Sequence, residues 1–143
     1  MRILVLCTGN SARSQIAEAF LRSFDDRLEV YSAGTVPSLF VNPHTIQVMR
    51  EVGVEIGDTR PKSVEMFLEQ PFDFVITVCA DADRNCPVFS GRVGRRVHIG
   101  FDDPARTTGN PEEVAAVFRR VREEIRASLR QFYECEIKPL IAP

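Results

Sequence analysis

The chain has 143 residues, a formal net charge of −2 at pH 7, 44% hydrophobic residues and 27% charged residues. This length predicts one domain over residues 1–143, and this composition excludes a wholly disordered chain. The near-neutral charge argues against a nucleic-acid-binding protein, and no apolar run is long enough to span a bilayer or to form an export signal. We therefore expect a monomer in the cytoplasm, with neither a membrane nor a nucleic-acid partner.

The first half of the chain predicts two strands and two helices. The apolar run Arg2–Leu6 is typical of a buried parallel strand, and Leu28–Tyr31 predicts a second strand. A helix between them is indicated by apolar residues at spacings of three and four: Ile16, Ala19, Phe20 and Phe24. Asn42 and Pro43 predict the start of another helix, as its N-cap and first residue, and Gly53 predicts its end.

The second half predicts a short helix, two strands and a long amphipathic helix. The short helix covers Ser63–Leu68, and the strands cover Phe72–Val78 and Arg96–Ile99. The long helix has one apolar face: Val114, Val117, Phe118, Val121, Ile125 and Phe132. Because strands alternate with helices, we predict a doubly wound α/β fold with about four parallel strands and helices on both faces.

The segment between the first strand and the first helix combines a cysteine with an arginine six residues later. Ligands of open α/β sheets bind at this position, where loop N–H groups and a helix N-terminus favour an anion. Cys7 would be a nucleophile in its thiolate form, Arg13 would grip two oxygens, Ser14 would donate to the sulfur, and Gly9 would allow unusual dihedral angles. The predicted oxyanion cradle is Thr8, Gly9, Asn10, Ser11, Ala12, Arg13 and Ser14. The alternative is an inert buried cysteine followed by a surface arginine.

The segment Cys7–Glu18 resembles the phosphate loop of the low-molecular-weight tyrosine phosphatase superfamily, and more narrowly that of its thioredoxin-coupled arsenate reductases. Gln15 departs from the phosphatases, which usually have Pro there, and Ala12 departs from the many relatives that have Cys. The resemblance continues through further motifs in order: Tyr31–Gly34, Asn42-Pro43, Val52–Val54, Val78-Cys79, Cys86-Pro87 and Gly100–Arg106. It implies the phosphatase-like α/β fold over nearly the whole chain.

Two further cysteines flank a polar stretch after the third predicted strand. Cys79 ends that strand, so it should lie at the same edge of the sheet as Cys7, and Cys86 follows across what we interpret as a mobile loop. A zinc half-site is one alternative, but zinc sites space their cysteines more closely and need four ligands. A pair of unrelated buried thiols is another. The resemblance favours redox chemistry, because plain phosphatases generally lack this pair.

The resemblance also assigns roles to residues that the pattern alone leaves ambiguous. Asp103, which precedes Pro104, matches the family's general acid, although Asp before Pro is also an ordinary turn. Asn10 matches the residue that braces the loop. Some relatives bind potassium near it, with Glu18 and Ser32 matching ligands. Lys62 falls where an acidic ligand is expected, so we predict no metal.

The remaining candidates are interpreted as structural. His44 lies in the first turn of a predicted helix and His98 in a predicted strand. Cys135 follows the last apolar residue of the final predicted helix and is expected to be a bystander.

The resemblance implies arsenate reduction to arsenite by Cys7, Cys79 and Cys86 acting in turn, with Arg13 binding arsenate and Asp103 protonating the leaving oxygen. Reduced thioredoxin would regenerate the thiols, no organic cofactor would be bound, and phosphate or sulfate would compete with arsenate. Two alternatives remain open. One is a tyrosine phosphatase, against which Ala105 stands where phosphatases tend to have an aromatic residue. The other is a non-enzymatic oxyanion-binding or redox-sensing module.

Overall fold

A computed structural model describes residues 1–141 and contains a four-stranded parallel sheet in the order β2-β1-β3-β4. The strands are β1 (Arg2–Cys7), β2 (Glu29–Gly34), β3 (Phe72–Thr77) and β4 (Val93–His98). The chain therefore starts in the middle of the sheet, winds outward to β2 and then returns past β1 to β3 and β4. This confirms the doubly wound α/β prediction, and it places the switch in strand order at the carboxyl end of β1.

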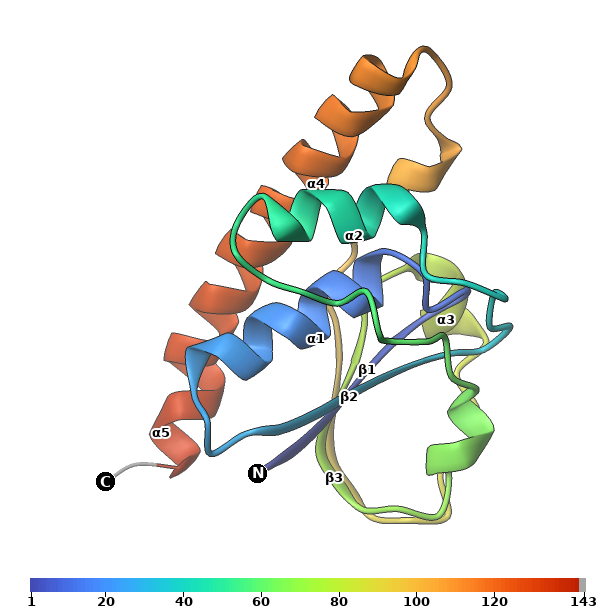
Figure 1. The fold of residues 1–143 in the computed structure, drawn as a ribbon. Coiled ribbons are helices and arrows are strands. Elements are labelled where there is room, and N and C mark those ends of the chain that lie inside the picture. Colours follow the sequence, from blue (N-terminus) through green and yellow to red (C-terminus); the bar gives the residue numbers. More distant parts are fainter. Residues whose placement is uncertain (142–143) are drawn as a thin grey trace.

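Five helices and three shorter helical turns surround the sheet. The helices are α1 (Arg13–Phe24), α2 (Pro43–Arg50), α3 (Ala80–Arg84), α4 (Pro111–Phe132) and α5 (Lys138–Ile141). The turns are η1 (Val64–Phe67), η2 (Pro104–Arg106) and η3 (Tyr133–Ile137). Helices α1, α2 and α4 pack together on one side of the sheet, while α3 lies near the carboxyl ends of the strands (Figure 1). Within residues 1–141, no helix is both long and apolar enough to cross a membrane.

Strands β1 and β3 end within one residue of the sequence prediction, whereas β2 and β4 differ from it by three residues at one end. Strand β2 continues to Gly34, which pairs with Cys7, because the buried Ser32 obtains a hydrogen bond from Asn10 and so need not face solvent. Strand β4 begins at Val93, three residues before the predicted start. Its side chains are mostly exposed, so its first residues are not the apolar run by which a buried strand is predicted. The caps were better predicted: Asn42 accepts a bond from the backbone of His44 at 2.9 Å.

The predicted mobile loop after Cys79 is wrong in its first part, since Ala80–Arg84 forms helix α3. The Cys79 sulfur caps this helix by accepting a bond from the Ala82 N–H at 3.4 Å, and the Ala82 side chain is fully buried. Asp83 fastens the helix to the sheet, because its carboxylate accepts a bond from Thr77 at 3.1 Å and lies 3.5 Å from Arg96. These polar contacts order a segment whose sequence lacks large apolar residues.

The final helix buries apolar residues beyond the point that the sequence suggested. Tyr133 and Ile137 are both buried, so the prediction that Cys135 follows the last apolar residue is wrong. The reason is the π-helical turn η3, whose extra residue shifts the apolar face out of the 3.6-residue period. Cys135 itself is exposed.

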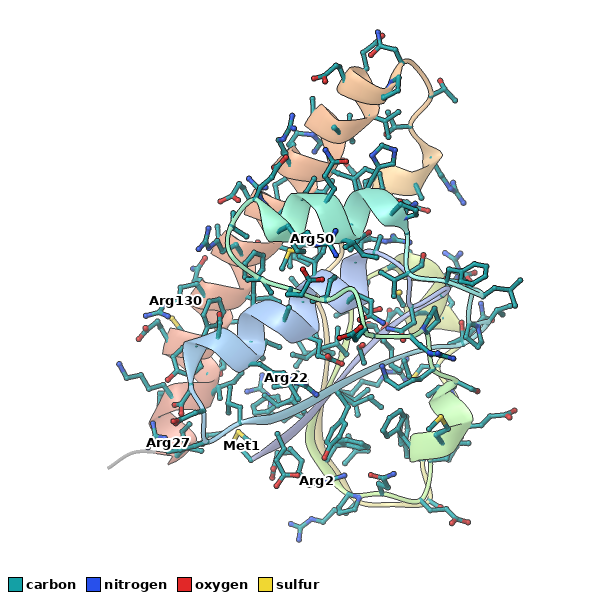
Figure 2. The ribbon with its side chains drawn as sticks, viewed as in Figure 1. Met1, Arg2, Arg22, Arg27, Arg50 and Arg130 are labelled. Atoms are coloured by element: carbon teal, nitrogen blue, oxygen red, sulfur yellow. The ribbon has the colours of Figure 1, made fainter. Side chains whose placement is uncertain are left out.

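A buried carboxylate ties the end of α1 to this last segment. Asp25 accepts bonds from the Tyr133 hydroxyl at 2.6 Å and from the Arg27 guanidinium at 2.7 and 2.9 Å. Figure 2 shows Arg27 beside the C-terminal helix, where these elements meet. The bonds from Arg27, followed by the bond from Tyr133, hold the pKa of Asp25 far below its ordinary value.

Removing the Tyr133 hydroxyl should destabilise the protein in a pH-dependent way. A pKa lowered by folding contributes stability that is fully present above the unfolded pKa, about 3.9, and is lost progressively as the pH falls from there through the much lower folded pKa. Tyr133→Phe should therefore lower the Tm by a few degrees at pH 7 and by less at about pH 2. The matched control is Tyr31→Phe, whose hydroxyl faces the exposed Glu29. Equal Tm changes in the two variants at both pH values would contradict the role assigned to Asp25.

Candidate active site

The loop between β1 and α1 turns its carbonyl groups outward. Five of the six carbonyls from Cys7 to Ala12 accept bonds from main-chain N–H groups, namely those of Thr35, Val36, Ser38, Asn42 and Ile16. The sixth, that of Asn10, accepts a bond from the Gln15 side chain at 3.1 Å. Because the N–H and C=O of a trans peptide point in opposite directions, the intervening N–H groups point into the loop. The interior is therefore a ring of donors suited to an anion.

The Cys7 sulfur lies inside this ring and receives two hydrogen bonds. The Asn10 N–H points at the sulfur from 3.2 Å, and the Ser14 hydroxyl lies 2.9 Å away. Asn10 Nδ2 donates to Ser14 Oγ at 2.7 Å, so the single hydroxyl hydrogen of Ser14 is free to point at the sulfur. Both bonds favour a negatively charged sulfur, and Cys7 is only 3% exposed.

The unusual backbone conformation predicted for Gly9 is found one residue later. Asn10 has a φ of 53°, in the left-handed region, whereas Gly9 has a negative φ. A Cβ on Gly9 would lie 2.6 Å from Ser38 Oγ, which is the rotatable end of an exposed side chain and can move aside. Gly34 is under a firmer constraint, because its Cβ would collide with the main-chain carbonyl of Thr8. The loop thus packs too closely against the end of β2 to admit a side chain at Gly34.

Arg13 reaches across the mouth of the loop toward Asp103. Its guanidinium donates to the Phe101 carbonyl at 3.2 Å and lies 3.6 Å from the Asp103 carboxylate. Asp103 is held in turn by the Ala105 N–H at 3.0 Å, so η2 orients it. These groups border a cleft of about 710 Å³ that also includes Thr8 and Cys79. The structure therefore brings four of the predicted groups, Thr8, Arg13, Cys79 and Asp103, to one opening.

Cys79 shares a hydroxyl group with the loop. Its sulfur lies 3.5 Å from Thr8 Oγ1, which also donates to the Asp81 carboxylate at 3.1 Å. A hydroxyl has one hydrogen, so with Asp81 as its acceptor the Cys79 thiol is the donor to Thr8. The second thiol thus lies next to the cradle that holds the first.

Cys86 lies in a different place. It is half-buried in a neighbouring cleft of about 380 Å³, lined by apolar groups such as Val75, Val88 and Val93. Burial raises the pKa of its thiol, an effect opposed by the nearby Arg96 charge. All four cysteines are free. The structure therefore does not bring Cys86 into the cleft that Cys79 borders.

The groups expected around a potassium ion are already bonded to one another. Asn10 Oδ1 accepts bonds from the Lys62 N–H at 2.9 Å and from Gln15 at 3.2 Å, and Ser32 accepts one from Asn10. The buried Glu18 has Arg22 3.7 Å away and feels the charge of Lys62. Burial lowers the pKa of Lys62, and Glu18 opposes that shift. This donor set does not fit a cation, and no step below uses one.

A family comparison decides what this loop belongs to. The model of the low molecular weight phosphotyrosine protein phosphatase family matches residues 2–139. The chain belongs to this family. It is 45% identical to an arsenate reductase of Shouchella clausii (strain KSM-K16) over 92% of this chain and 94% of that one. It is 42% identical to an arsenate reductase of Bacillus subtilis (strain 168), with the same coverage.

Solved structures of this phosphatase family agree. An arsenate reductase in its phosphate-binding state is 26% identical with a TM-score of 0.77, covering 93% of this chain and 96% of that one. A thioredoxin-dependent arsenate reductase of Corynebacterium glutamicum is also 26% identical, with a TM-score of 0.65, covering 93% of this chain and 59% of that one.

Several contributors to the site lie outside the sequence predictions. The Phe101 carbonyl and the Asp81 carboxylate have no sequence signal for these contacts, which arise from distant loops. Gln15 was visible only as a departure from the phosphatase pattern. His98 bonds to Thr77 at 2.8 Å, and the His44 ring packs 5.2 Å from that of Phe118. Neither histidine borders the cleft next to Cys79.

The Ser14 hydroxyl should control the reactivity of Cys7. Ser14→Ala removes a donor to the sulfur and should slow alkylation of Cys7 at pH 7 by about tenfold, as expected for a lost hydrogen bond to a charged group. Iodoacetamide labelling of the Cys7 peptide, followed by mass spectrometry, measures this rate. Ser23→Ala is the matched control, because Ser23 bonds to Phe20 on the same helix away from the loop. Unchanged labelling in Ser14→Ala would show that the hydroxyl does not act on the sulfur.

Proposed function

We propose that this chain reduces arsenate to arsenite. The observation that carries the proposal is a pair of thiols at one loop: Cys7 inside a ring of N–H donors and Cys79 beside Thr8 of the same ring. A phosphatase needs only the first thiol, whereas reduction needs a second one, because two sulfurs together give two electrons to arsenic when they join in a disulfide. The arsenate reductases at 42–45% identity support this choice.

The first step forms a bond between the Cys7 sulfur and arsenic. Arsenate occupies the ring of N–H groups, and the guanidinium of Arg13 binds two of its oxygens. The Cys7 thiolate attacks arsenic, and a hydroxyl group leaves as water after receiving a proton from Asp103. The arsenic is still pentavalent, and the protein holds it through the sulfur.

The second step is the reduction. Cys79 gives up its thiol proton and attacks the sulfur of Cys7, so a disulfide forms while the bond between sulfur and arsenic breaks. The bonding pair stays on arsenic, which becomes trivalent, and the departing arsenite takes up the proton that Cys79 released. Thr8 assists by turning its hydrogen from Asp81 to the Cys79 sulfur as the charge develops there.

The third step moves the disulfide away from the cradle. The Cys86 thiolate attacks the Cys79 sulfur, which releases the Cys7 thiolate for another cycle. Since Cys86 lies in a separate cleft, this step requires residues 80–90 to rearrange, and α3 must loosen its contacts through Asp83.

Reduced thioredoxin then attacks the Cys79–Cys86 disulfide and restores both thiols. The thioredoxin-dependent relative from Corynebacterium glutamicum supports this electron donor. In this scheme the chain acts as a monomer in the cytoplasm, uses no bound organic cofactor and is inhibited by phosphate or sulfate, which occupy the same ring of donors.

Phosphate-ester hydrolysis is the second candidate, as a side activity of the same loop. Cys7, Arg13 and Asp103 make up the set of groups that it needs. The family match supports it. Ala105, in the middle of η2, puts no aromatic side chain at that position, which disfavours phosphotyrosine as the main substrate.

Cysteine variants separate the two activities. Cys7→Ser should abolish arsenate reduction and phosphate-ester hydrolysis together, because both use the same nucleophile. Cys86→Ser should abolish thioredoxin-coupled reduction, measured as NADPH consumption in the presence of thioredoxin reductase, and should leave hydrolysis of para-nitrophenyl phosphate within about twofold. Cys135→Ser is the control and should affect neither, because Cys135 is exposed and distant from both clefts. Full reduction by Cys86→Ser would exclude the relay.

Variants of the adjacent residues Asp103 and Asp102 test whether Asp103 is the general acid. Asp103→Asn should lower kcat for both reactions by about a hundredfold, in the range of general acid catalysis. Asp102→Asn should change either kcat by less than about twofold, because Asp102 is mostly exposed and faces Arg120 at 3.4 Å. Steady-state rates with each substrate measure the effect, and equal losses in the two variants would remove Asp103 from its role.

A further inference from the structure

Gln15 is a buried side chain whose amide faces the catalytic loop from outside. It lies in the first turn of α1 and is 1% exposed. Its Nε2 atom lies 3.1 Å from the Asn10 carbonyl, 3.2 Å from Asn10 Oδ1 and 3.4 Å from the Arg60 carbonyl. All three atoms are acceptors. The reverse orientation would place Gln15 Oε1 against three oxygens, so the chemistry of the surroundings determines which way the amide points.

This amide does what a main-chain group does elsewhere in the loop. The carbonyls of Cys7, Thr8, Gly9, Ser11 and Ala12 accept bonds from backbone N–H groups. The Asn10 carbonyl accepts its bond from Gln15. A side chain has more freedom than a backbone segment, so this is the position in the ring where a single substitution removes the donor.

Asn10 is also the residue on which both bonds to the Cys7 sulfur depend. Its own N–H makes one of them, and its Nδ2 orients the Ser14 hydroxyl that makes the other. Its φ of 53° lies in the left-handed region, which Asn adopts more readily than most residues with a side chain but at a cost relative to ordinary backbone, so bonds from outside the loop stabilise this conformation. Gln15 bonds to both the main-chain and the side-chain oxygen of Asn10.

We propose that Gln15 is a positioning residue for the Cys7 nucleophile, which acts by holding Asn10 in its left-handed conformation. It touches neither the sulfur nor the cleft. By binding the Arg60 carbonyl as well, it joins the loop to the segment that precedes η1, so that both move as one unit. The proposal rests on the proposed function only in taking Cys7 as the reacting thiol.

The Lys62 N–H limits the size of the effect. It also donates to Asn10 Oδ1, at 2.9 Å, so the Asn10 side chain keeps one external bond when Gln15 is replaced. The main-chain carbonyl of Asn10, in contrast, loses the hydrogen bond from Gln15 when Gln15 is replaced. Loss of Gln15 should therefore loosen the N–H that points at the sulfur more than it disturbs Ser14.

The test is the pH profile of Cys7 alkylation in the full chain with all four cysteines present. Gln15→Met keeps the length of the side chain and removes both donors. We expect the pH of half-maximal labelling of the Cys7 peptide to rise by about 0.5–1, which is about a twofold to fivefold lower rate at the natural midpoint. Inorganic phosphate should protect Cys7 only at concentrations several times higher than in the natural chain. Labelling of the Cys135 peptide should not change.

A second variant separates positioning from folding. Ile16→Val shortens the next side chain of α1, which is fully buried and apolar, and should lower the Tm. The Ile16 N–H, which donates to the Ala12 carbonyl, belongs to the main chain and is kept in this variant. This variant should leave the Cys7 profile unchanged. Gln47→Met, at an exposed site on α2, should change neither the Tm nor the profile.

The outcomes are distinct. An unshifted profile in Gln15→Met, or an equal shift in Ile16→Val, overturns the role of Gln15. A shifted profile in Gln15→Met alone supports it, even if the chain fails to reduce arsenate, a result that would overturn only the proposed function.

Discussion

The ring of N–H groups around Cys7 exists because the surrounding chain binds the opposite side of each peptide. The chain that follows β2 runs alongside the loop and supplies donors from Thr35, Val36 and Ser38, while Asn42 supplies another just before α2. Since these bonds hold the loop carbonyls outside the ring, the N–H groups face its interior and are available to an oxyanion. The close approach this requires explains Gly34, where a Cβ would meet the main chain of the loop.

The three redox thiols occupy environments that suit different tasks. Cys7 receives two hydrogen bonds from groups that favour a charged sulfur. Cys79 shares Thr8 with the Asp81 carboxylate, so its activation depends on which acceptor holds one hydroxyl hydrogen. Cys86 is in an apolar cleft, where burial raises the pKa of its thiol and the nearby Arg96 opposes that shift. In the proposed relay Cys86 reacts last, because it lies outside the cleft that Cys79 borders.

Helix α3 controls the passage between the second and third thiols. It is one and a half turns long, starts at the sulfur of Cys79, and is held to the sheet by small or polar contacts rather than by an apolar face. Such contacts are individually weak and are exchanged readily for water. The segment is thus ordered in the reduced chain and able to reorganise, which a helix with a large buried face would resist.

The sequence alone determined the class of fold and the chemistry-bearing residues. Alternation of apolar strands with amphipathic helices indicated the parallel sheet, and the spacing of Cys7 and Arg13 between a strand and a helix indicated an anion site. Both patterns involve residues close together in the sequence, so they can be recognised without knowledge of the tertiary contacts. Local signals were also sufficient for Asn42 as a helix cap, but they placed the unusual backbone at Gly9 rather than at Asn10.

Only the tertiary structure decided which distant groups complete the site. Helix α3 depends on Thr77 and Arg96, the separation of Cys86 from Cys79 depends on the cleft beside β4, and the burial of Ile137 depends on a π-helical turn. Gln15 shows the limit most clearly. In the sequence it is one polar residue in a helix. Its proposed role depends on three oxygen atoms that accept from its amide, two on Asn10 and one on Arg60, which is 45 positions away. Only folding brings these oxygens to a single amide.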